Sequence, residues 1–159
     1  MSRKKIFTIG APELRKIANP ITKFDARLGV ILRDMAETMY QADGVGLAGP
    51  QVGIQRRLVV VDVGDGLIEF VNPEITNKEG LCDMVEGCLS VPGRRGLVSR
   101  PEKVTVNAQD KTGKPFTFEA DGLLARCIQH EIDHLDGVLY VDKMEREIFP
   151  EEEDEDQDD

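Results

Sequence analysis

Both histidines of the chain lie four residues apart in a segment that is apolar enough to form a buried helix. Apolar residues recur there at helical spacing, between a possible N-terminal cap at Asp121 and a stop at Asp136-Gly137: Leu123, Leu124, Cys127, Ile128, Ile132 and Leu135. Residues i and i+4 share one helical face, so His130 and His134 are expected to lie side by side. A helix buried in this way must be enclosed by other elements, which restricts the possible folds more than any other segment does.

The remaining hydrophobic pattern predicts one further helix and several strands. The helix begins after Asp25 and ends at Asp43-Gly44, with an apolar stripe of Leu28, Ile31, Leu32, Met35 and Met39. Strands are expected at 6–9, 58–63, 68–71, 104–108 and 116–120, with a hairpin turn at 110–114 and a turn or short helix at 11–13. Residues 44–53 contain four glycines and a proline, which predicts irregular backbone. The chain is therefore expected to be a single α+β domain.

The charge of the chain is concentrated at its C-terminal end. The formal net charge is -10, but eight of the last nine residues are acidic, which leaves -2 for residues 1–150. We expect residues 1–149 to form the folded domain and 150–159 to be a disordered acidic tail. This charge argues against nucleic-acid binding, and no apolar run reaches the length of a membrane span. An odd number of cysteines, three, and the lack of an apolar signal segment favour a reducing cytoplasm.

The histidine pair has the spacing of a metal site. His130 and His134 can bind one ion, and Glu131, about 100° round the helix, then lies beside a water at that ion. A third ligand must come from elsewhere, because Cys127 lies about 7.5 Å along the axis from the midpoint of the two histidines. Cys88 is the better candidate, since Gly87 lets the backbone come close to the helix.

Two rival interpretations remain at this point. A zinc endopeptidase shares the His-Glu-x-x-His helix but generally uses a carboxylate or histidine as third ligand, and the chain has no third histidine. A noncatalytic metal-binding module is disfavoured because Glu131 would have no structural duty in a closed site. The identity of the third ligand distinguishes the zinc endopeptidase from other enzymes with this helix, and the effect of Glu131→Gln on turnover distinguishes an enzyme from a noncatalytic module.

Three segments together resemble the three motifs of the peptide deformylases, in order and in approximate spacing: 44–51, 86–90 and 129–134. The resemblance covers roughly residues 6–143. It implies antiparallel β-sheets packed around the central helix that carries His-Glu-x-x-His, together with an N-terminal helix. It also implies removal of the N-formyl group from the formylmethionine of new polypeptides. The expected partners are thus N-formylmethionyl peptides and nascent chains.

The resemblance also implies a role for individual residues. The metal ligands would be Cys88, His130 and His134, and metal-bound hydroxide would attack the formyl carbon with Glu131 as general acid/base. The Gln51 amide and the Leu89 backbone N–H would stabilise the oxyanion. Candidates for substrate binding are Val45, Gly46, Arg95, Cys127 and Ile128, and we expect Glu86 to pair with Arg100 and brace the Cys88 segment. Fe²⁺ is the implied physiological ion, while Zn²⁺, Ni²⁺ and Co²⁺ also suit one thiolate and two imidazoles.

The C-terminal end departs from many bacterial members of the family. Those members continue into a long helix that contacts the ribosome, whereas residues 144–148 are expected to form at most a short turn before the acidic tail. Carboxylates repel RNA phosphates, so ribosome docking by this route is not expected. A short form of this kind is compatible with a bacterial cytoplasm, an organellar stroma or matrix, or the cytoplasm of a phage-infected host.

Overall fold

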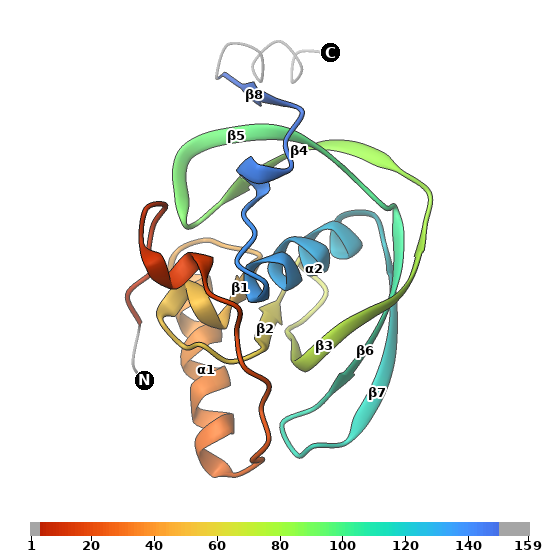
Figure 1. Ribbon diagram of the computed structural model, residues 1–159. Coiled ribbons are helices and arrows are strands. Elements are labelled where there is room, and N and C mark those ends of the chain that lie inside the picture. The colour runs from red at the N-terminus through yellow and green to blue at the C-terminus, as the bar shows by residue number, and fades with distance from the viewer. Residues whose placement is uncertain (1–3, 150–159) are drawn as a thin grey trace.

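Two antiparallel sheets and two α-helices form the core of the structure, a computed structural model that describes residues 4–149 (Figure 1). The large sheet has the strand order β1-β2-β3-β6-β7, and its strands are β1 (Gly46–Ala48), β2 (Leu58–Val61), β3 (Ile68–Glu79), β6 (Lys103–Gln109) and β7 (Pro115–Asp121). The small sheet has the order β4-β5-β8, with β4 (Cys82–Cys88), β5 (Val91–Arg100) and β8 (Arg146–Ile148). The α+β prediction is confirmed.

The histidine-bearing helix α2 (Gly122–Leu135) lies between the two sheets, with β4 and β5 arching over it (Figure 1). Its apolar face packs against one face of the large sheet, in a cluster that includes Val59, Val61, Phe70, Val104, Val106, Ile128, Ile132 and Leu135. The helix ends as predicted, because Gly137 has a φ of +76° and a side chain there would meet the Arg15 carbonyl oxygen. The central position of the helix follows from its apolar pattern.

The other predicted helix, α1 (Ala26–Gln41), covers the opposite face of the large sheet. The Asp25 side chain caps it by accepting a hydrogen bond from the Leu28 N–H. Its stripe packs against β2 through Leu28, Leu32, Met35 and Met39. Leu58 and Val60 of β2 face α1, while Val59 and Val61 face α2. This explains why β2 is continuously apolar and does not alternate.

Three short 3₁₀ helices lie outside the two sheets, η1 (Pro12–Arg15), η2 (Gly49–Val52) and η3 (Tyr140–Asp142), and the last of them contacts β4 and β5 of the small sheet. Beneath this sheet lies a separate apolar cluster made of Leu14, Val91, Val98, Leu139 and Tyr140. The predicted turn or short helix near Pro12 is confirmed as η1, and the β6–β7 hairpin forms around 110–114. The small sheet itself was not predicted from the sequence.

Several predicted elements were wrong in position or type. Residues 6–9 form no strand, because Phe7 donates to the Gln51 carbonyl and Ile9 to the Ser90 carbonyl, two different segments. Residues 44–53 are not wholly irregular, since they contain β1 and η2. Strand β3 continues eight residues past 71, through a bulge at Asn72 with φ +52°.

Two corrections concern the ends of the chain's later elements. Residues 146–148 form strand β8 instead of a turn, pairing with 95–97 of β5. Asp121 occupies the N-cap position of α2, but its side chain makes no capping hydrogen bond. No helix within residues 4–149 is long and apolar enough to cross a membrane. The acidic tail, 150–159, lies outside the described residues, and its predicted disorder stays a prediction.

Candidate active site

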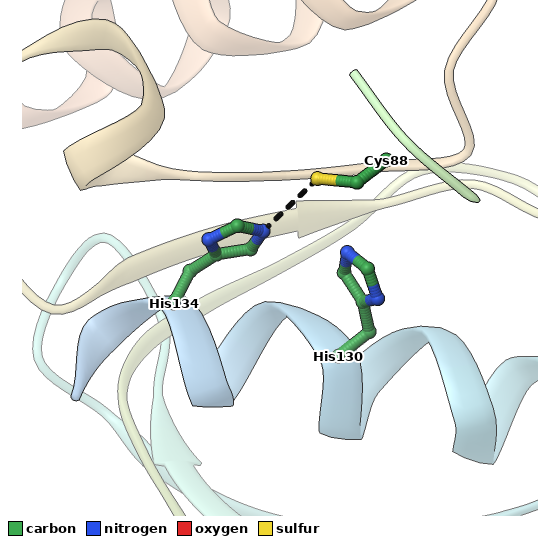
Figure 2. A group of neighbouring side chains, drawn as sticks. All are labelled: Cys88, His130 and His134. Carbon is green, nitrogen blue, oxygen red and sulfur yellow. Dashed lines mark hydrogen bonds between the residues drawn. The ribbon is translucent and has the colours of Figure 1, made fainter. Parts of the chain in front are cut away.

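One thiol and two imidazoles converge where the β4–β5 turn meets α2 (Figure 2). One ligand atom from each of Cys88, His130 and His134 lies within 4.8 Å of the other two, and Cys88 Sγ is 3.3 Å from His134 Nε2. Both histidines are buried, and Cys88 is partly buried. The predicted triad is therefore brought together from segments more than forty residues apart in the sequence.

The ring of His130 is held by a buried carboxylate. Its Nδ1 lies 2.8 Å from Glu86 Oε1. An ionised carboxylate can only accept hydrogen bonds, so Nδ1 carries a proton, and in the neutral imidazole that binds a metal ion it is Nε2 that keeps its lone pair. Burial alone would raise the pKa of Glu86, but hydrogen bonds with His130 and Arg100 outweigh it and lower the pKa to about 2. The carboxylate thus stays ionised and keeps His130 in the tautomer that a metal requires.

Two arginines neutralise this carboxylate. Arg100 donates to Glu86 through Nε and Nη2, and its Nη1 donates to Asp133 Oδ2 at 2.8 Å. Arg126, on α2, donates to Glu86 Oε2, to the Val98 carbonyl and to the Cys82 carbonyl, which joins the helix to β4 and β5. The predicted Glu86–Arg100 pair is confirmed. Arg126 was missed, although a charged residue in an otherwise apolar helix, one turn before His130, was a signal for it.

Glu131 follows His130 in the sequence and lines the same cleft. Only 4% of its surface is exposed, its Oε1 has no hydrogen-bond partner among residues 4–149, and burial raises its pKa to about 7. Strand β1 passes close by: a methyl group at Gly46 would lie 2.5 Å from Glu131 Oε2 and 2.7 Å from Cys127 Sγ. A glycine at 46 is therefore needed for β1 to approach the helix. A carboxyl group with a pKa near neutrality is suited to both taking up and giving up a proton.

Gln51, in η2, points its amide at Cys88. Its Oε1 accepts a hydrogen bond from the Ala48 N–H at 2.9 Å, and its Nε2 lies 3.1 Å from Ser90 Oγ and 3.6 Å from Cys88 Sγ. The loop before it is tight, because a methyl group at Gly49 would lie 2.6 Å from two backbone carbonyl oxygens, those of Ile54 and Arg56. The structure thus places Gln51 beside the predicted metal ligands.

A cleft of about 650 Å³ opens in front of these groups. Four of the predicted substrate-binding residues line it: Val45, Gly46, Arg95 and Cys127. Burial raises the pKa of the Cys127 thiol, which stays neutral and lies 3.4 Å from the Val45 carbonyl oxygen. Leu89 also lines the cleft, and Ile148 of β8 and Leu123 of α2 extend its apolar wall. These last two were not anticipated, because neither lies in a recognisable motif.

Ile128 is the one predicted substrate-binding residue that does not line this cleft. It is fully buried against the large sheet. The difference follows from helical geometry, because residues 127 and 128 point about 100° apart around the axis. Cys127 faces the cleft and Ile128 faces the sheet.

The donor set fits a divalent metal ion. A thiolate and two imidazoles are ligands for zinc and for other first-row metals, and three protein ligands leave one coordination position open, as in catalytic sites. The tautomer imposed by Glu86 and the unpartnered carboxylate oxygen of Glu131 agree with such a site.

The sequence profile of the polypeptide deformylase family matches residues 3–148 of this chain. The chain belongs to this family. A peptide deformylase of Caldicellulosiruptor bescii is 55% identical over 152 residues, which cover 96% of this chain and 92% of that protein. One of Caldanaerobacter subterraneus is 54% identical and covers 96% of each chain. The prediction of a metal-dependent peptide deformylase is thus confirmed.

Solved structures agree in fold. The peptide deformylase of Thermotoga maritima superposes with a TM-score of 0.90 at 43% identity, covering 92% of this chain and all of that one. The peptide deformylase of Synechococcus elongatus, solved in complex with actinonin, gives a TM-score of 0.88 at 44% identity and covers 98% of this chain and 84% of that one. The implied arrangement of antiparallel sheets around the histidine-bearing helix is confirmed, and the zinc endopeptidase interpretation is set aside.

Proposed function

We propose that Cys88, His130 and His134 hold one divalent metal ion and that Glu131 is the general acid/base of deformylation. The observation that carries this proposal is the convergence of the three ligand atoms within 4.8 Å, next to a buried carboxyl group whose pKa is about 7. When bound, a metal ion polarises a carbonyl group and lowers the pKa of water. The remaining steps belong to side chains and backbone groups of this chain.

Glu131 moves the proton. As the carboxylate it takes a proton from the attacking water, and as the acid it gives that proton to the nitrogen of the leaving amine. A pKa near 7 leaves both forms accessible at neutral pH. Burial of the carboxyl group keeps bulk water from competing for its proton.

The oxygen of the formyl group becomes negatively charged as water adds to the carbon. We assign its stabilisation to the Nε2–H of Gln51 and the backbone N–H of Leu89, which approach the Cys88 region from η2 and from the β4–β5 turn. The amide of Gln51 is held on its oxygen side by the Ala48 N–H, which directs its nitrogen toward this region. Such preorganised donors are worth most where water is excluded.

The cleft suits an extended formylated peptide. The backbone of Gly46, the first residue of β1, is available to pair with the substrate, and Val45 and Cys127 offer an apolar surface to the methionine side chain. Arg95, an exposed residue of β5, lies at the rim where the peptide leaves the cleft. Formylmethionyl peptides and nascent chains are therefore the substrates we propose.

Fe²⁺ is the ion that we propose for the living cell, with Zn²⁺, Ni²⁺ or Co²⁺ as functional substitutes. The matched relatives are bacterial, so we place the activity in the cytoplasm, where formylated chains are made. We do not propose ribosome docking through a C-terminal helix, because the carboxylates of 150–159 would repel RNA phosphates. Metal analysis after anaerobic purification tests the first of these statements.

The substitution Glu131→Gln tests the mechanism. It removes the proton carrier and keeps the size of the side chain, so we expect kcat on formyl-Met-Ala-Ser to fall by roughly 10³-fold or more while the bound metal is retained. Glu119→Gln, in the exposed part of β7, is the matched control and should leave kcat unchanged. Unchanged turnover in Glu131→Gln, with full metal content, would contradict the role assigned to this carboxyl group.

A further inference from the structure

Ser90 is a fully buried polar residue that no step described so far uses. It occupies the turn between β4 and β5, since Cys88 pairs with Val91 across this turn. Its backbone N–H donates to Cys88 Sγ at 3.4 Å, and its hydroxyl oxygen lies 3.1 Å from Gln51 Nε2. Ser90 thus contacts both a proposed metal ligand and a proposed oxyanion donor.

The direction of the Gln51 amide depends on these contacts. The last side-chain torsion of glutamine is broad, so the amide plane turns easily unless both of its ends are held. The oxygen end is held by the Ala48 N–H at 2.9 Å, and the nitrogen end by Ser90 Oγ. With one hydrogen of Nε2 given to Ser90, the other is directed toward Cys88 Sγ, at 3.6 Å. Of these three contacts, only the one with the Ser90 hydroxyl can be removed by a side-chain substitution that leaves the backbone and the proposed metal ligands unchanged.

We propose that Ser90 is a positioning residue: its hydroxyl accepts one Nε2 hydrogen of Gln51 and thereby aims the other at the reacting oxygen. This inference rests on the role given to Gln51 in the proposed function. A positioned donor contributes to the transition state and little to substrate binding, because the charge on the oxygen develops only as the reaction proceeds. Loss of the hydroxyl should therefore lower kcat and leave KM nearly unchanged.

The kinetic test is a double-mutant cycle on Ser90→Ala and Gln51→Ala, with formyl-Met-Ala-Ser as substrate. We expect Ser90→Ala to lower kcat about 10-fold with KM within about twofold, and Gln51→Ala to lower kcat about 10²- to 10³-fold. In the double variant the serine substitution should add nothing further, because it acts through Gln51. Ser99→Ala, in the same strand pair, is the matched control and should leave kcat unchanged.

A second readout does not depend on activity. In the zinc-loaded, ¹⁵N-labelled protein, the side-chain amide of Gln51 is identified by the signal that Gln51→Ala removes. We expect its two protons to exchange slowly with water in the original protein and roughly 10-fold faster in Ser90→Ala, while the thermal midpoint and the metal content stay close to those of the original. If Ser90 only filled space, its replacement by alanine would not change this exchange.

The outcomes separate this inference from the proposed function. Full kcat and slow amide exchange in Ser90→Ala would overturn the positioning role, as would a double variant that loses activity by the product of the two single losses. If Gln51→Ala itself keeps full kcat, the oxyanion role of Gln51 fails, and with it the catalytic consequence of Ser90. Faster exchange in Ser90→Ala would even then show that the hydroxyl orients the amide.

Discussion

The two sheets are stabilised by different kinds of contact. The large sheet carries apolar side chains on both faces, with Val59 and Phe70 packed against α2 and Leu58 and Val60 against α1. The small sheet has an apolar cluster on one side, but its contact with α2 is made by buried ions, in which Glu86 binds two arginines. Helix α2 lies between them and is therefore apolar toward one sheet and ionic toward the other.

This difference separates the scaffold from the site. Hydrocarbon packing is non-directional and tolerates changes of similar volume, whereas a buried ion network depends on the placement of every donor and acceptor. The metal ligand Cys88 lies at the end of β4, within this network, and His130 takes its tautomer from Glu86. The small sheet thus fixes the orientation of the side chains in the site, and the large sheet fixes the position of the helix.

The largest effect is expected from breaking the ion network at its centre. Glu86→Ala leaves Arg100 and Arg126 buried without their shared carboxylate, which should destabilise the fold by about 3–5 kcal/mol. Val106→Ala, in the large sheet, should cost about 1–3 kcal/mol. Urea unfolding measures both free energies.

The affinity for metal should also differ between a change in the small sheet and a change in the large sheet. Because His130 loses the acceptor of its Nδ1–H, we expect Glu86→Ala, or the milder Glu86→Gln where the alanine variant does not fold, to bind Zn²⁺ about 10- to 100-fold more weakly. Val106→Ala should bind Zn²⁺ as the original protein does. Equal loss of affinity in the two variants would show that the sheets do not differ in this way.

The regions that sequence patterns predicted are those stabilised by packing of apolar side chains. Helix α1, helix α2 and the β6–β7 hairpin all follow simple apolar periodicities, and each was found near its observed position. In β4 and β5 the buried positions include Glu86 and Arg100, so polarity does not report burial there and no alternation is visible. The strands of the small sheet were missed for this physical reason.

The candidate site was predicted to a different extent for each kind of residue. The spacing of His130 and His134 on one helix is a local signal, and the motifs around Gln51 and Cys88 placed the other groups through the family resemblance. Ser90 was missed, because its importance comes from a contact with a residue 39 positions away. Long-range contacts between polar side chains leave no periodic trace in a sequence.

Acid should weaken the small sheet before the large one. The pKa of Glu86 is about 2 in the folded chain and near 4.5 in the unfolded chain, so its stabilisation is present above pH 4.5 and is lost as the pH falls toward 2. The shift corresponds to about 3 kcal/mol. In the metal-free protein, hydrogen exchange at β4 and β5 should therefore speed up between about pH 4.5 and 2 more than exchange at β2 and β3, after correction for the intrinsic rates. An identical pH dependence in Glu86→Gln would rule out this carboxyl group as the cause.

The smallest effect is expected at the outer edge of the small sheet. Arg94 of β5 donates to both carboxylate oxygens of Glu147 in β8, at 3.0 and 2.9 Å, but both side chains are partly exposed. Exposed ion pairs are screened by salt, so Glu147→Gln should speed hydrogen exchange at β8 only roughly two- to fivefold at low ionic strength. The difference should vanish in high salt, where exchange at β4 stays as slow as before.

This last variant tests whether ion pairs matter in the small sheet because they are charged or because they are buried. Ile148 of β8 lines the cleft, so a loosened strand should raise KM for formyl-Met-Ala-Ser by no more than about twofold and leave kcat unchanged. A clear loss of kcat in Glu147→Gln would mean that the exposed pair also holds the geometry of the site. If kcat is retained, burial is what makes Glu86 important: with water excluded, no solvent molecule can replace this carboxylate as the acceptor for Nε and Nη2 of Arg100 and for Nδ1 of His130.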